Sequence, residues 1–148
     1  MSSDGKRELL RHMVATVVFR GRVAIDGAPD AFADFKASDD ARTAREILAH
    51  IGDLLHGSES LLRGEYIEID SAPLTWNDEV ARFFASARKL DELLAGDQTL
   101  AYPVEKFVQG PVGDALTHVG QIVMLRRIAG VPVVPEPYFT AEIVAGNF

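Results

Sequence analysis

Apolar residues recur every three or four positions in four long segments, and this spacing constrains the fold more than any other feature of the sequence. In the second and clearest segment, about Ala41 to Arg63, the apolar positions are Ala44, Ile47, Leu48, Ile51, Leu54, Leu55, Leu61 and Leu62. The other three segments span about Lys6–Ile25, Thr75–Gly96 and Val104–Ala129. This spacing places the apolar side chains on one face of an α-helix, and that face must be buried. The sequence therefore predicts an all-α protein with four helices.

Several residues mark where these helices begin, bend and end. Thr75 stands three residues before Asp78, which is the spacing of a capping box, and Gly64 is a plausible end for the second helix. Gly110-Pro111 must break or kink the fourth helix near its start, because proline lacks the N–H that a helix interior needs. Residues 131–148 contain three prolines, so we expect an extended tail that crosses the helices. The alternating run at residues 65–70 is too short to establish a sheet.

These elements predict one domain over residues 1–148, folded as an antiparallel four-helix bundle with an extended C-terminal tail. A length of 148 residues is ordinary for a single domain with one core. In such bundles, metal and cofactor sites are built from side chains that project inward from facing helices.

Composition narrows the classes of function. The net charge is −7, from 22 acidic and 15 basic residues, and this balance argues against nucleic acid as a partner. No stretch approaches the roughly 20 apolar residues of a membrane span, and the N-terminal residues do not form a signal peptide, so we expect a cytoplasmic protein with no membrane contact. The sequence has no cysteine, so any metal must be held by nitrogen and oxygen ligands.

Helical phase separates the four histidines. His50 lies at the shoulder of the apolar face of its helix, whereas His56 lies nearly opposite that face and His12 also points away from its own apolar stripe. Asp114 and His118 stand four residues apart on an apolar face of the fourth helix, so their side chains come together on one surface. A carboxylate and an imidazole at this spacing form a common chelating pair.

The residues leave two interpretations of these side chains open. A buried histidine is often a hydrogen-bonded core residue, and an Asp–His pair can be a plain ion pair. Alternatively, His50, Asp114 and His118 form a metal site suited to zinc, nickel, manganese or ferrous iron. Three protein ligands leave a coordination position for water or substrate, as in catalytic sites.

Two motifs give the chain a family resemblance. His118-Val-Gly-Gln121, followed by Leu125-Arg-Arg127, resembles the last-helix motif of the DinB-like superfamily. The stretch 46–55, Glu-Ile-Leu-Ala-His-Ile-Gly-Asp-Leu-Leu, resembles the second-helix motif of the same family. The motifs occur in the family's order, and with the four-helix pattern the resemblance covers nearly the whole chain.

The resemblance implies a four-helix bundle, often dimeric, with a divalent metal held by three histidines. His50 and His118 match two of these ligands by position, and the third falls where this chain has Asp114. Aspartate can bind a metal, but its shorter reach and its charge change affinity and metal preference. Characterised members of the family include thiol-dependent transferases and isomerases, in which the metal activates a small-molecule thiol.

Two hypotheses for the function follow. The first is a metal-dependent transferase or isomerase that uses a small-molecule thiol, with His50, Asp114 and His118 as ligands. The second is a non-catalytic bundle that binds a small apolar ligand or a partner without metal, with the same three residues as a hydrogen-bond network. The sequence does not decide whether the protein is an enzyme. Because the last helix carries two apolar faces, we also expect a homodimer with two-fold symmetry.

Overall fold

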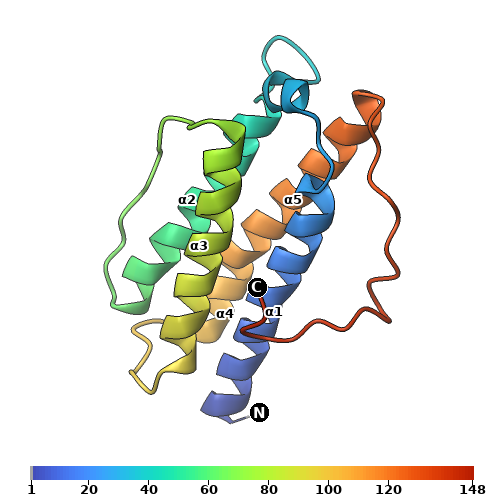
Figure 1. Ribbon diagram of the computed structural model, residues 1–148. Helices are drawn as coiled ribbons and strands as arrows, with labels where there is room; N and C mark the ends of the chain where they lie inside the picture. The colour runs from blue at the N-terminus through green and yellow to red at the C-terminus, as the bar shows by residue number, and fades with distance from the viewer. Residues whose placement is uncertain (1) are drawn as a thin grey trace.

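The computed structural model describes residues 2–148, and all regular secondary structure in that range is helical (Figure 1). The prediction of an all-α protein is therefore confirmed. No helix in this range is both long and apolar enough to cross a membrane. In chain order the elements are α1 (Ser3–Ile25), the 3₁₀ helix η1 (Asp30–Asp34), α2 (Ala44–Leu62), α3 (Trp76–Ala95), the single turn α4 (Val104–Phe107), the π-helical segment η2 (Val108–Val112) and α5 (Gly113–Ile128).

Polar caps determine where the long helices begin. The Thr43 hydroxyl accepts a hydrogen bond from the backbone N–H of Glu46, whose carboxylate accepts one from the N–H of Thr43. This capping box makes α2 begin at Ala44, three residues after the predicted start. α1 begins at Ser3 and not at Lys6, because the Ser2 hydroxyl caps it. Thr75 caps α3 as predicted, through the N–H of Asp78.

α2 packs against α3 and α5, and α1 packs against the same two helices. α1 and α5 end near η1, where a guanidinium nitrogen of Arg126 donates to the carbonyl of Ala24 at 3.0 Å. α2 and α3 begin at that same end, where the ring of Trp76 packs edge-on against the ring of Phe32. α2 and α3 therefore run in one direction, and α1 and α5 run in the other (Figure 1).

The connection from α2 to α3 is long because these neighbouring helices run the same way. Residues 63–75 contain no helix or strand and return along the outside of α2 to the end where α2 began (Figure 1). They can span roughly 40 Å when extended. α2, with 19 residues, is about 28 Å long. This connection covers one side of α2 and takes part in the cavity described below.

One apolar core joins the helices. Its largest fully buried side chains include Phe83, Phe107, Leu48, Ile51 and Leu90. The tail, residues 131–148, lies outside this core along α1 (Figure 1), without helix or strand. The ring of Tyr138 holds the tail against α1, because it packs edge-on against Phe19 and lies 4.1 Å from the guanidinium carbon of Arg20.

Candidate metal centre

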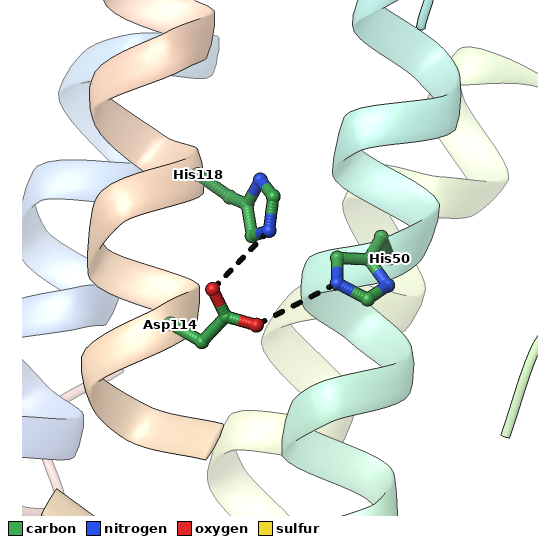
Figure 2. Close-up of side chains that lie close together, drawn as sticks. All are labelled: His50, Asp114 and His118. Atoms are coloured by element: carbon green, nitrogen blue, oxygen red, sulfur yellow. Dashed lines mark ion pairs between the residues drawn. The ribbon is translucent and has the colours of Figure 1, made fainter. Parts of the chain in front are cut away.

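The structure brings His50, Asp114 and His118 together between α2 and α5. Figure 2 shows the three side chains pointing toward one another, His50 from α2 and the other two from successive turns of α5. Nε2 of His118 lies 3.4 Å from Oδ1 of Asp114, and Nε2 of His50 lies 3.8 Å from Oδ2 of the same carboxylate. The two imidazole rings are nearly perpendicular, with centroids 4.7 Å apart.

A break in the fourth helix sets the position of Asp114. Gly110 has non-helical backbone angles, and Pro111 cannot donate a backbone hydrogen bond, so the chain passes through the π-helical turn η2 before α5 begins. The kink predicted from Gly110-Pro111 is thus present. At Gly113 the carbonyl oxygen of Val108 comes so close that a Cβ atom would collide with it. Glycine at this position lets α5 start directly before Asp114.

Gln121 orients the imidazole of His118. Nδ1 of His118 lies 2.9 Å from Oε1 of Gln121, one turn further along α5. Because an amide oxygen can only accept, Nδ1 carries the proton, and in the neutral ring Nε2 is left with a lone pair. That lone pair faces the Asp114 carboxylate, which is also an acceptor. A proton or a cation between these two atoms would make the contact attractive.

The environment of His50 favours its neutral form. Its pKa is lowered from the ordinary value, mainly because partial burial disfavours the charged imidazolium and secondarily because His118 is close, although Asp114 acts in the opposite direction. Metal ligands must be deprotonated, so a lowered pKa makes His50 a better ligand near neutral pH.

The spacing of the donor atoms fits one divalent ion. Nitrogen and oxygen ligands lie about 2.0–2.2 Å from zinc, so tetrahedral ligands stand about 3.4 Å from one another. Each of the three residues offers one donor atom such that all three atoms lie within 4.8 Å of one another. The two His–Asp separations, 3.4 and 3.8 Å, are too long for good hydrogen bonds but close to the tetrahedral spacing. Small rotations of these side chains would bring all three donors onto one ion.

Exposure differs among the three residues in a way that leaves one side of the site open. The side chains of His118 and His50 are 13% and 27% exposed, whereas Asp114 is 48% exposed. The other two histidines, His12 and His56, are exposed, as their helical phase predicted. The phase argument therefore selected the two histidines that meet.

A second polar cluster on α2 was not predicted from the sequence. The Arg82 guanidinium on α3 donates to Oδ1 of Asp53 at 2.5 Å, to Oε2 of Glu79 at 2.8 Å and to the carbonyl of Ala49 at 2.8 Å. The remaining carboxylate oxygens of Asp53 and Glu79 accept the backbone N–H groups of Ser71 and Leu74, each at 2.8 Å. Glu79 is fully buried. This cluster fixes the second half of the 63–75 connection to α2 and α3.

A cavity of about 930 Å³ opens beside the three residues. His50 and Asp114 contribute to its wall, together with side chains of α2, of the 63–75 connection, of α4 and of η2. A pocket of this size lies at the upper end of the range for small-molecule sites, roughly 300–1,000 Å³. The sequence did not indicate this cavity, because its wall combines segments whose contacts depend on how the chain returns along α2.

Among family models, curated proteins and solved structures, none matches this chain. The chemistry of the site is therefore argued from the residues themselves. The resemblance to the DinB-like superfamily stays a prediction that depends on the two motifs.

Proposed function

We propose that this chain is a divalent-metal-binding four-helix-bundle protein of the DinB-like kind, with His50, Asp114 and His118 as the metal ligands. The observation that carries the proposal is the convergence of three donor atoms from two helices within 4.8 Å of one another. The orientation of His118 by Gln121 supports it, because ligand histidines usually donate their second ring N–H to an acceptor.

The placement of the two motifs supports the family. His50 of the first motif and His118 and Gln121 of the second all come to one place, although the motifs are far apart in the sequence. The aspartate at position 114 occupies the place of the family's third histidine and still faces the other two residues. The packing of α1, α2, α3 and α5 around one core, with two helices running in each direction, supports a four-helix bundle.

The arrangement suits transfer or isomerisation chemistry. A divalent ion at this position would supply Lewis acidity, which stabilises a thiolate nucleophile or polarises a carbonyl group. His50, Asp114 and His118 occupy one side of the site, and the cavity bordered by His50 and Asp114 gives a small-molecule thiol or its reaction partner a way in. The protein would then be an enzyme, acting as a metal-dependent, thiol-using transferase or isomerase.

The alternative is a bundle that binds a small apolar ligand without metal. The cavity itself favours this second function, because its size suits a ligand whether or not an ion is present. In that case the three polar residues would form a hydrogen-bond network, with a proton between His50 or His118 and Asp114. The two functions differ in one measurable property, the response of the protein to divalent metal.

Metal analysis of protein purified without an affinity tag tests the proposal. We expect close to one divalent ion per chain and a melting temperature that rises with added zinc, because the site exists only in the folded state. His118→Ala should abolish the zinc effect, whereas His56→Ala, an exposed histidine on α2, should leave it intact. Equal zinc responses of these two variants would refute the proposed site. Asp114→His should tighten zinc or nickel binding by restoring three imidazole ligands.

We further propose that the protein is a homodimer. Met124 and Ile128, one turn apart on α5, have exposed fractions of 54% and 55%, so α5 presents an apolar face to solvent. A two-fold axis beside α5 would bury this apolar face against the same face of a second chain. Light scattering should give twice the 16.1 kDa chain mass, and Ile128→Asp should shift the mass toward that of one chain. A single-chain mass for the unsubstituted protein at high concentration would exclude the dimer.

A further inference from the structure

We infer that the cavity beside the three residues binds an elongated amphipathic molecule, with an oxygen-donor head at His50 and Asp114 and a medium-length alkyl or acyl chain along α2. This inference rests on the proposed metal site for the head group only. The chain is recognised by a separate part of the cavity, so the two parts can be tested independently.

The shape of the cavity follows a single stripe of α2. His50, Leu54, Gly57 and Leu61 all line it and succeed one another at spacings of four, three and four residues, which places them on one face of the helix. Eleven residues of helix extend about 16 Å. The cavity is therefore a groove that starts at the proposed metal site and continues for three turns toward the end of α2. A compact ligand would leave most of this length empty.

The lining away from the metal end is mainly apolar. Leu54 and Leu61 form its floor on α2, and the connection lies over this floor with Tyr66, Ile67 and Ile69 facing the same cavity. The connection passes close to α2 at Gly57, because a Cβ atom there would lie at contact distance, 3.6 Å, from the carbonyl oxygen of Ile67. On the opposite side the groove is lined by Phe107 and by the π-helical turn with Pro111. These surfaces suit methylene groups.

Several polar side chains line the groove, among them Glu68, Lys106 and Gln109, and the two that belong to the proposed metal site, His50 and Asp114, lie at one end of it. Both carboxylate oxygens of Asp53 already accept hydrogen bonds, one from Arg82 and one from the N–H of Ser71, so Asp53 anchors the wall of the groove. Asp114 and His50 approach each other to 3.8 Å at this end, and together they can hold a polar head group through the proposed ion. A ligand would thus bind with its polar head at these residues and its chain toward Leu61.

The 63–75 connection, which forms the wall over the groove, is exposed enough for a residue in it to be substituted without unfolding the protein. Ile67 has an exposed fraction of 53% and lies outside every helix. Val144 offers a matched control, because it is also β-branched, has an exposed fraction of 50%, lies in the extended tail and is not among the residues that line the cavity. An aspartate at either position adds one charge, and only the one at position 67 faces the groove.

The test uses two probes with the same head group, acetohydroxamate and octanohydroxamate, whose binding to zinc-loaded and metal-free protein is measured by calorimetry. Burial of a methylene group contributes about 0.8 kcal/mol, or about fourfold in affinity, so octanohydroxamate should bind roughly sixtyfold more tightly if only three of its extra methylenes are buried. Ile67→Asp should reduce this ratio at least severalfold, and Val144→Asp should leave it unchanged. Circular dichroism checks that both variants keep their helices.

The outcomes separate the groove from the metal site. Equal affinities for the two probes, or a ratio unaffected by Ile67→Asp, would overturn the groove inference even if zinc binds stoichiometrically. A tighter binding of both probes by zinc-loaded protein, lost in His118→Ala, reports the metal site, since His118 does not line the cavity. If zinc had no effect but the ratio persisted, the proposed metal function and the metal-directed head group would fail, and a groove for an apolar chain would stand.

Discussion

α2 carries two polar clusters that lie one helical turn apart. They differ in how completely their polar groups are paired in hydrogen bonds. On the side facing α3, Asp53 lies in a closed cluster with Arg82 and Glu79, in which the side-chain hydrogen bonds span 2.5 to 2.8 Å. On the side facing α5, Nε2 of His50 and Nε2 of His118 lie 3.8 and 3.4 Å from the two carboxylate oxygens of Asp114, and both distances are longer than a good hydrogen bond.

The difference indicates different roles. Buried polar groups in a folded protein are hydrogen-bonded, and the Asp53 cluster obeys this rule down to the fully buried Glu79. The His50 cluster is more exposed, and its two His–Asp separations, 3.8 and 3.4 Å, are longer than good hydrogen bonds. A satisfied cluster stabilises the fold and can accept no further partner, whereas an unsatisfied one beside a cavity is suited to bind a cation.

The largest effect should come from breaking the satisfied cluster. Arg82→Met leaves Asp53 and Glu79 without their cation, and removing one member of a buried ion pair costs about 3–5 kcal/mol. Arg82 keeps some exposure, so we expect a loss of about 3 kcal/mol in the free energy of unfolding, measured in urea. Arg88→Met, an exposed arginine on α3, should change it by less than about 0.5 kcal/mol. Similar losses in the two variants would mean that the cluster does not stabilise the fold.

A smaller effect, on metal affinity and not on stability, should come from Gln121. Gln121→Leu removes the acceptor that orients His118, and loss of such a partner costs about 10–100-fold in metal affinity. Because Gln121 is exposed, the stability of the metal-free protein should hardly change. Gln121→Glu keeps an acceptor at this position and should preserve or increase zinc affinity. Zinc titrations in which the Leu and Glu variants behave alike would show that His118 needs no orientation by this residue.

The smallest effect should be on the pH dependence of the metal-free protein. His50 has a folded-state pKa below its ordinary value of about 6.5, chiefly because of burial, so the unfolded chain binds more protons between these two values. Stability should be fully present above about pH 6.5 and should fall as the pH drops through the lowered pKa. His50→Gln should remove this part of the pH dependence in urea unfolding with a chelator present. If the free energy of unfolding changed equally with pH in the unsubstituted protein and in His50→Gln below about pH 6.5, the proposed environment of His50 would be contradicted.

The sequence predicted the unsatisfied cluster better than the satisfied one, for a physical reason. The phase of His50 on α2 and the four-residue spacing of Asp114 and His118 are local properties of helices, so they could be read before the packing was known. The pairing of Asp53 with Arg82 depends on α3 running in the same direction as α2, and helical periodicity carries no information on direction. The place of Ile67 in the groove could not be predicted from the sequence either, because Ile67 faces the groove only where residues 63–75 return along α2.

X-ray absorption spectroscopy at the zinc edge, on protein loaded with one equivalent of zinc, tests the central claim most directly because it counts the ligands themselves. We predict a shell of nitrogen and oxygen ligands at about 2.0–2.1 Å that includes two imidazoles, His50 and His118. The count should fall to one imidazole in His118→Ala and rise to three in Asp114→His. A shell without imidazole, or two imidazoles that persist in His118→Ala, would contradict the site.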